Sequence, residues 1–386
     1  MITTLAFFAM ALVPHNGFSQ AETSAIETSF RQFAQSKGAH GGALIVTDGS
    51  GTVTVPFGVR NEKGDPFLES TPNRVASVTK ALTSTAILRL VQDGKLKLDD
   101  SVLDILNKDS ERPIKPRQEE MRAITVRQLL QHTSGFGSDL LINEQLTTSR
   151  KYGLPLPVPK ESLVLLAFER ETLTSKPGTN FSYSNIGYLI LGRVIAKVSG
   201  MSYEDFVKSS VLTPAGVSKD EAYIGHSKKL HENETRYWDL PGRTGMSLYG
   251  EDKLARVPFP YGCYTLEQMD ASGGWVMSVR ALIQFQQALP KLVSSELQRE
   301  LVAPPAIAGR TSSYTGLGFT IIAESNGGYT LQHGGNLEGC NATIMYRANG
   351  QVIAAVFNTG GMPQDNSWAF TYVNQVLCPI LNQMGN

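Results

Sequence analysis

The pattern of apolar residues changes twice along the chain, and this constrains the fold more than any other feature. Near the N-terminus, the runs GALIVTDG and TVTVPFGV flank the turn sequence DGSG and predict a β-hairpin. From there to about residue 215, apolar residues recur with helical spacing. From about residue 316, strand-like runs return, joined by short turns that favour antiparallel neighbours, and a last helix closes the chain. Strands at both ends with helices between them indicate an α+β fold, with helices inserted into one sheet.

This order of elements predicts two domains. Residues 22–75 and 271–386 would form a domain in which helices flank an antiparallel sheet built from both termini. Residues 76–270 would form a mainly helical insertion domain. Within it, residues 217–262 are polar and irregular, and a loop of this length inside a compact domain is usually functional or partly disordered. We expect this loop to form part of a cleft rim.

The first 21 residues predict a signal peptide. Residues 5–13 form a short apolar core, and Ser19 and Ala21 put small side chains at the two positions that a signal peptidase recognises. The stretch before the core lacks Lys and Arg, so a mis-assigned start or a buried N-terminal segment is the alternative. We expect export, to the periplasm or outside the cell, followed by an amphipathic helix over residues 24–38.

Charge and hydropathy exclude several classes of partner. Lys and Arg together number 35, as do Asp and Glu, so the net charge is zero and no basic surface argues for nucleic acid. No stretch after the N-terminus is long and apolar enough to span a membrane. A small molecule or a short polymer is therefore the expected partner, and the oligomeric state is left open.

Cysteine and histidine spacings give no sign of a metal centre. The three cysteines, Cys263, Cys340 and Cys378, are too few and too scattered for a disulfide framework or a metal cluster. One bridge is possible, but the spacing does not say which. The six histidines have no metal-ligand spacing, so we expect neither a metal nor an organic cofactor.

The stretch RVASVTKALTSTAILRLVQDG, residues 74–94, predicts a helix that is apolar on most sides. Ser77 and Lys80 are three positions apart, so their side chains would share a face on its first turn. Burial and the positive end of the helix dipole both disfavour an ammonium, and a lysine that gives up its proton beside a hydroxyl activates a nucleophile. The alternative is that Ser77 caps the helix and Lys80 extends to solvent.

A second motif, Tyr183-Ser184-Asn185, lies just before another apolar helix. A lysine ammonium lowers the pKa of a phenol beside it, and the phenol can then take a proton from a hydroxyl or return it to a leaving group. An asparagine can hold a lysine and a substrate carbonyl at once, because its amide both donates and accepts. Alternatively, Asn185 caps the helix and Tyr183 packs in the core.

A third motif, QHGGNLEGCN at residues 332–341, lies at the end of a predicted strand. Its two glycines would allow another group to approach the backbone closely. A ligand carbonyl beside this strand could accept a main-chain hydrogen bond, as in an oxyanion hole. The alternative is a glycine turn.

Together, SVTK, YSN and HGG give the sequence a specific resemblance to the serine β-lactamase and penicillin-binding protein superfamily. The flanking stretches ITVRQLLQHTSGFG, KPGTNFSYSNIGYLILG, KLKLDDSVLDIL and ASGGWVMSVRAL are typical of its class C-like branch of esterases, D-stereospecific peptidases and acyl transferases. The resemblance covers nearly the whole chain after its first residues. It implies a β-lactamase/transpeptidase-like fold with a cleft between the sheet domain and the helical insertion.

The resemblance also implies catalytic roles. Ser77 would be the nucleophile that forms an acyl-enzyme. Lys80 and Tyr183 would share the general acid and base work, and Asn185 would orient Lys80 and the substrate. The oxyanion would be bound by the N–H groups of Ser77 and Asn336.

The strand residues His333, Gly334 and Gly335 would bind substrate, and His333 departs from the lysine that β-lactamases and most DD-peptidases of the superfamily have there. That lysine is a fixed cation for a substrate carboxylate, whereas histidine is largely neutral at pH 7 unless a neighbour holds its proton. The departure favours neutral acyl substrates such as esters. It does not decide the matter, since some D-peptidases and esterases of the branch share it.

The sequence therefore predicts an exported serine hydrolase that cleaves a small ester, an amide or a short peptide through an acyl-serine, with esterase activity favoured. The alternatives are a D-alanyl carboxypeptidase, a D-aminopeptidase or a weak β-lactamase acting on cell-wall peptides, and, in another class, a penicillin-binding-like sensor without turnover. We interpret His132 as structural and assign no role to Glu338 or Cys340.

Overall fold

The computed structural model describes residues 17–137, 140–250, 253–307, 312–325, 327–361 and 367–384. The signal peptide predicted for residues 1–21 lies almost entirely outside this part of the chain, and export stays a prediction. The first helix, α1 (Gln20–Ser36), begins four residues earlier than expected, because Ser19 and Glu22 form a capping box.

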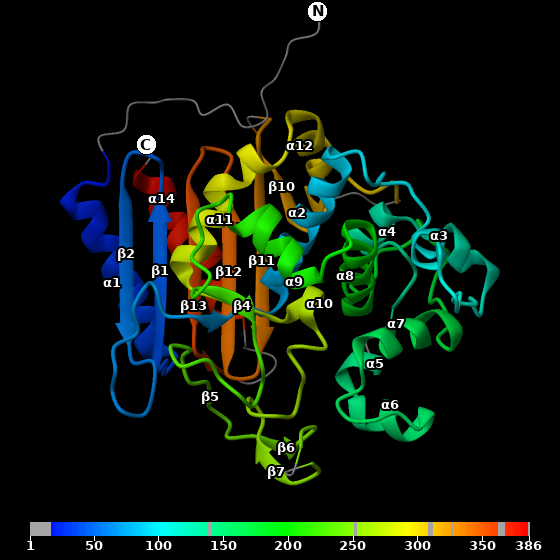
Figure 1. Ribbon diagram of the computed structural model, residues 1–386. Helices are drawn as coiled ribbons and strands as arrows, with labels where there is room; N and C mark the ends of the chain where they lie inside the picture. The colour runs from blue at the N-terminus through cyan, green and yellow to red at the C-terminus, as the bar shows by residue number, and fades with distance from the viewer. Residues whose placement is uncertain are drawn as a thin grey trace, which may run out of the picture.

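One antiparallel sheet of seven strands organises the molecule, with the strand order β2-β1-β13-β12-β11-β10-β9 (Figure 1). The strands are β1 (Gly41–Thr47), β2 (Thr52–Gly58), β9 (Ser313–Thr315), β10 (Thr320–Ala323), β11 (Tyr329–Leu337), β12 (Cys340–Tyr346) and β13 (Val352–Phe357). The N-terminal hairpin pairs with the C-terminal strand β13, so the sheet is built from both ends of the chain. The predicted α+β fold is confirmed.

Both faces of this sheet are buried. On β1, Ala43 and Ile45 point into one apolar core, while Leu44 and Val46 point into another, as alternation along a strand requires. The second core is covered by α1 and by the C-terminal helices α13 (Trp368–Tyr372) and α14 (Cys378–Met384), which a π-helical turn (Val373–Leu377) connects. The helices α11 (Val279–Leu292) and α12 (Ser295–Val302) contribute to the first.

The remaining helices lie on the β11 and β10 side of the sheet in Figure 1, away from β1 and β2. They are α2 (Thr79–Gln92), α3 (Val102–Asn107), α4 (Val126–Leu130), α5 (Leu140–Asn143), α6 (Gln145–Tyr152), α7 (Lys160–Glu169), α8 (Asn185–Ser199), α9 (Tyr203–Val207) and α10 (Asp270–Gly273), with short helical turns at Ala76–Val78, Glu119–Ala123 and Lys208–Leu212. The helix α2 is buried along almost its whole length, as its apolar pattern predicts. It contacts both α8 and α10. None of the helices in the described residues is long and apolar enough to cross a membrane.

The stretch predicted to be an irregular loop, residues 217–262, contains short strands. They are β4 (Ala222–Ile224), β5 (Trp238–Asp239), β6 (Thr244–Met246) and β7 (Arg256–Pro258). β4 joins β3 (Asn73–Arg74) and β8 (Trp275–Met277) in a small sheet, and β5 pairs with β14 (Thr359–Gly360). The expected insertion therefore contributes strands to pairings with both flanking segments, and the division into two domains stays a prediction.

Arg74 connects this stretch to β3. Its fully buried guanidinium donates to the carbonyl of Pro260 at 2.7 Å and to that of Ser227 at 3.1 Å. It also lies 4.0 Å from the ring centroid of Tyr237 and 3.8 Å from the carboxylate of Glu234, which is itself buried. One buried cation thus holds residues 227–260 against the segment that leads to Ser77.

We predict that Arg74→Met lowers the free energy of unfolding by about 3–5 kcal/mol, because it leaves the Glu234 carboxylate buried without its cation. Urea denaturation would measure the loss. The matched control is the double variant Arg74→Met/Glu234→Gln, which removes both charges and should recover part of the stability. A single variant as stable as the wild type would contradict this account of the loop.

Candidate active site

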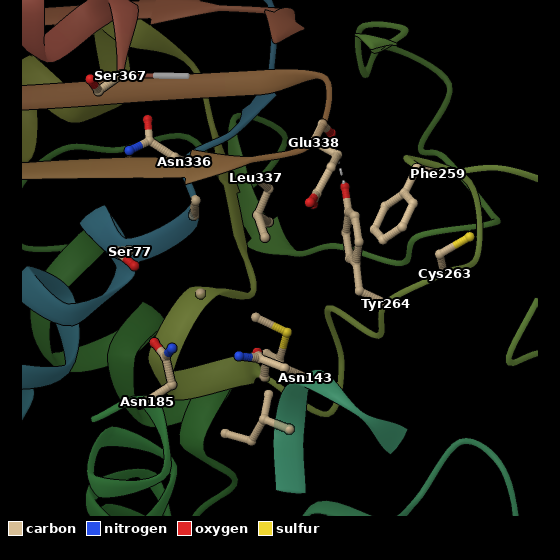
Figure 2. A pocket seen from close by; sticks show the side chains of 14 residues that line it. Ser77, Asn143, Asn185, Phe259, Cys263, Tyr264, Asn336, Leu337, Glu338 and Ser367 are labelled. Atoms are coloured by element: carbon tan, nitrogen blue, oxygen red, sulfur yellow. Dashed lines mark hydrogen bonds between the residues drawn. The ribbon is translucent and has the colours of Figure 1, made fainter. Parts of the chain in front are cut away.

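Ser77 lies in the 3₁₀ turn Ala76–Val78, between β3 and α2. The prediction that Ser77 lies in the first turn of the α-helix is therefore wrong, since α2 begins two residues later, at Thr79. Ala76, directly before it, has a φ of +48°, a conformation that residues other than glycine rarely adopt. The chain turns sharply here and presents the Ser77 side chain to a cleft, where Figure 2 shows it.

Lys80, in the first turn of α2, is fully buried beneath Ser77. Its Nζ lies 3.1 Å from Ser77 Oγ, 2.7 Å from Asn185 Oδ1 and 2.5 Å from the carbonyl oxygen of Ser272. The alternative in which Lys80 extends to solvent is therefore wrong. The oxygens of Asn185 and Ser272 can only accept, so each takes a hydrogen from Lys80 Nζ. The third position on Nζ, which holds either a hydrogen or the lone pair, faces Ser77 Oγ.

Tyr183 approaches Ser77 from the other side. Its hydroxyl lies 2.8 Å from Ser77 Oγ, and its side chain is 41% exposed, so it does not pack in the core. Ser184, and not Asn185, caps α8, because its side chain accepts from the N–H of Gly187. Asn185 is therefore left with its side chain turned to Lys80, and both alternatives raised for this motif are wrong.

His132 holds the turn that carries Tyr183. Its carbonyl accepts from the N–H of Ser182 at 2.8 Å, its Nδ1 accepts from the N–H of Ser184 at 3.0 Å, and its ring packs on that of Tyr183 with centroids 4.4 Å apart. Burial, followed by the charges of Lys80 and His333, lowers the pKa of His132 well below its usual value. The imidazole is therefore neutral, as an acceptor at Nδ1 must be, and the residue positions the turn.

The third contact of Lys80 could not be found from the sequence. The carbonyl of Ser272 belongs to α10, whose first residue, Asp270, binds Lys160 at 2.7 Å and Arg193 at 2.6 Å. These ion pairs fix α10 against α7 and α8. A backbone acceptor leaves no side-chain signature, so the only signal was the stretch ASGGWVMSVRAL as a whole.

The strand β11 runs directly against the turn that carries Ser77. A Cβ on Gly335 would lie 2.1 Å from the carbonyl oxygen of Val75 and 2.9 Å from the backbone N of Ser77, distances that only glycine permits. At Gly335 the expected close approach to the backbone is made by the chain's own Ser77 turn. The consequence is that Asn336 and Ser77 line the same cleft (Figure 2).

His333 lies on the same strand, partly buried, with its Nδ1 2.7 Å from the carbonyl oxygen of Gly334. Burial, followed by the charge of Lys80, lowers the pKa of His333 to about 4. The ring is neutral near pH 7, as the sequence predicted.

Two cavities meet at Ser77. The first, which we call the Glu338 cavity, has a volume of about 640 Å³ and lies beside Asn185, Tyr264 and Glu338. The second, which we call the His333 cavity, has a volume of about 520 Å³. It is lined by aromatic and histidine side chains, which are His132, Phe181, Tyr183, Phe319, His333 and Phe370. Both cavities also share Asn336 and Ser367, so the cleft extends to both sides of the serine.

The predicted cleft-rim loop and one of the three cysteines line the Glu338 cavity. The predicted loop at residues 217–262 contributes Phe259 to the Glu338 cavity, which agrees with its expected place on the rim. Cys263 lines the same cavity, Cys340 is buried, and these two and Cys378 are all free thiols.

We predict that Gly335→Ala lowers the free energy of unfolding by about 1–3 kcal/mol, because the new methyl group forces β11 away from the Ser77 turn. Any turnover that depends on both segments should fall at least about tenfold. Gly334→Ala is the matched control, since its Cβ would meet only the Phe370 side chain, at 3.2 Å. Equal losses in the two variants, measured by denaturation and by turnover, would contradict the assignment.

A second prediction concerns pH. A histidine of the unfolded chain protonates near pH 6.5, whereas His333 stays neutral in the folded protein down to about pH 4. Between these values the unfolded state binds more protons, so the stabilising contribution is complete above pH 6.5 and is lost as the pH falls. His333→Gln should therefore make the free energy of unfolding less steep in pH by up to about 1.4 kcal/mol per pH unit, an upper value for a partly buried group. Urea denaturation between pH 6.5 and 4.5 would measure both slopes, and equal slopes would contradict the lowered pKa.

Known proteins resemble the chain over most of its length. The Beta-lactamase family model matches residues 26–377. The Dichelobacter nodosus protein named "Probable fimbrial assembly protein FimD, serogroup H1" is 29% identical over 299 residues, which are 77% of this chain and 68% of that protein.

Two solved structures have a similar fold. The octameric penicillin-binding protein homologue from Pyrococcus abyssi is 25% identical, with a TM-score of 0.68 over 94% of this chain and 78% of its own. The D-amino acid amidase from Ochrobactrum anthropi SV3 is 20% identical, with a TM-score of 0.71 over 95% of this chain and 99% of its own, a likeness of fold alone. Because the family model extends over most of the sequence, from the first helix almost to the last, the chain belongs to the Beta-lactamase family.

Proposed function

We propose that the protein is a serine hydrolase that cleaves ester or amide bonds through an acyl-enzyme on Ser77. The observation that carries the proposal is the surroundings of one hydroxyl. Ser77 Oγ lies 3.1 Å from Lys80 Nζ and 2.8 Å from the hydroxyl of Tyr183, so two groups able to move a proton contact the same oxygen. The hydroxyl also borders both cavities, where a substrate would reach it.

The contacts of Lys80 allow two routes for the serine proton. If Lys80 is a neutral amine, its two hydrogens bond to Asn185 and Ser272, and its lone pair faces Ser77 Oγ as the base. If Lys80 is an ammonium, all three hydrogens are used, and the base is Tyr183 as a phenolate, which becomes a phenol when it takes the serine proton. Lys80 and Tyr183 therefore act as a pair, and the proton belongs to the pair.

In the first half of the reaction, Ser77 Oγ attacks the substrate carbonyl carbon and gives its proton to this pair. The carbonyl oxygen becomes an oxyanion, which we assign to the N–H groups of Ser77 and Asn336 on the two segments that Gly335 brings together. Tyr183 then returns the proton to the leaving group as the bond to it breaks. In the second half, water attacks the acyl-serine by the same proton route and releases the acid.

Esters are the favoured substrates. His333 is neutral near pH 7, so the position that holds a fixed cation in most of the superfamily carries no charge here. The side chains around it in the His333 cavity are largely aromatic. Both features suit a neutral substrate better than one that needs its carboxylate neutralised. Export of the protein remains part of this proposal.

The second candidate is an amidase or peptidase acting on D-amino acid derivatives or cell-wall peptides, including a weak β-lactamase. The similar folds of a D-amino acid amidase and a penicillin-binding protein homologue favour it. A stable adduct with penicillin on Ser77, detected by mass spectrometry, would support it over an esterase. A sensor without turnover is the candidate from another class, and the complete set Ser77, Lys80, Tyr183 and Asn185 argues against it.

The test is hydrolysis of p-nitrophenyl butyrate by the wild type and by Ser77→Ala. We expect turnover that falls by at least about a thousandfold in the variant, because nothing replaces the nucleophile. Thermal unfolding of both proteins would show that the variant is folded. Equal turnover in the two folded proteins would overturn the assignment of Ser77, and no turnover in the folded wild type would favour the amide substrates or the sensor.

A further inference from the structure

The two cavities around Ser77 differ in which residue of the candidate site lines them, and the proton-transfer residue Tyr183 lines one of the two. Tyr183 lines the His333 cavity, whereas Asn185 lines the Glu338 cavity. The leaving group must receive a proton as it departs, so it has to lie beside the hydroxyl of Tyr183. The acyl part of the substrate then extends to the other side of Ser77, into the Glu338 cavity. This step depends on the function proposed above.

The Glu338 cavity contains a carboxylate and no basic side chain. Among the described residues that line it, Glu338 is the one acidic residue, and neither Lys nor Arg is present. Figure 2 shows its carboxylate pointing into the space between Leu337 and Tyr264. Glu338 lies in the turn between β11 and β12, two residues after Asn336, a separation that is at most about 7 Å along the chain. Its carboxylate therefore lies within reach of a charged group a few bonds from the reacting carbonyl.

Two aromatic rings stand beside this carboxylate. Phe259 and Tyr264 line the same cavity, with ring centroids 6.4 Å apart (Figure 2). Tyr264 is held in place, because its hydroxyl accepts from Arg74 at 2.7 Å and donates to the carbonyl of Glu338 at 3.3 Å. In Figure 2 the ring of Tyr264 lies next to the carboxylate, with Phe259 beyond it. A carboxylate with aromatic rings beside it is the chemistry that binds an ammonium group, quaternary ammonium included.

One basic side chain of the protein, Arg243, lies near Glu338 but outside the Glu338 cavity. Arg243 Nη1 lies 4.0 Å from Glu338 Oε1, and its guanidinium lies 5.8 Å from the ring centroid of Phe259. Its main partner is Asp239, which it contacts through Nε at 3.1 Å and through its backbone N–H at 2.8 Å. Arg243 does not line the cavity, so the face of Glu338 that is turned to the cavity stays available to a ligand.

We propose that Glu338, with Phe259 and Tyr264, selects substrates whose acyl group carries a positive charge. The preferred substrate class would be an ester or amide with a cationic acyl part and a neutral, apolar leaving group. The charge lies on the acyl side because the His333 cavity, which takes the leaving group, has no acidic residue among its described lining.

The test compares two esters of the same shape, p-nitrophenyl 4-(trimethylammonio)butanoate and p-nitrophenyl 5,5-dimethylhexanoate, which differ in one nitrogen-for-carbon exchange. In the wild type, kcat/KM should be about tenfold higher for the cationic ester. In Glu338→Gln this ratio should fall towards one. Glu111→Gln, an exposed site outside both cavities that changes the net charge equally, should keep the wild-type ratio. A wild-type ratio of one or less, or the same ratio in Glu338→Gln, would overturn the proposal.

A binding experiment separates this inference from the proposed hydrolysis. The matching amides, 4-(trimethylammonio)butanamide and 5,5-dimethylhexanamide, can be titrated into the wild type and into Glu338→Gln by calorimetry. Tighter binding of the cationic amide that is lost in Glu338→Gln would support the site even if neither ester were turned over, an outcome in which only the hydrolase proposal fails. Equal affinities for the two amides would overturn the site, whatever the turnover.

Discussion

The structure around the candidate site depends on one buried lysine. The Nζ of a buried lysine needs polar partners in place of water, and that of Lys80 has three on three segments: the Ser77 turn, the start of α8 and the end of α10. Each segment therefore has to come within 3.1 Å of one atom. The buried packing of α2 against α8 and α10 is the apolar framework that makes this possible. A small displacement of any of these segments would leave a buried charge without a partner.

The sheet supplies the other half of the site through a contact of a different kind. At Gly335 the backbone of β11 lies against the backbone of the Ser77 turn, with no side chain between them. The helices thus position Lys80 and Tyr183, while the sheet positions the N–H of Asn336. The turn that carries Ser77 contacts both the helices and the sheet. Arg74 is connected to both parts of this arrangement, because it donates to Tyr264 of the Glu338 cavity and precedes the Ser77 turn in the chain. It anchors β3, the last element before the turn.

The sequence predicted those parts of this arrangement that leave a periodic or chemical pattern. Apolar spacing predicted the strands β10 to β13 and the helices α2 and α8. The chemistry of a serine three residues before a lysine predicted the pairing of Ser77 with Lys80. The strands β4 to β7 were missed, since two or three residues carry no measurable period. The carbonyl of Ser272 could not be predicted, because any residue provides one. The glycine pair indicated a close approach to the backbone, but a sequence cannot say that the group approaching Gly335 is the Ser77 turn.

The same lysine also sets the charges around it. Its positive charge, added to the effect of burial, lowers the pKa of both His132 and His333, so neither ring competes with it as a cation near pH 7. A neutral His132 keeps its Nδ1 as the acceptor that holds the Tyr183 turn. A neutral His333 leaves its cavity without a fixed charge for a substrate carboxylate. The charge recognition that we propose lies on the opposite side of Ser77, where the carboxylate of Glu338 lies in a cavity lined by no basic residue of the described chain.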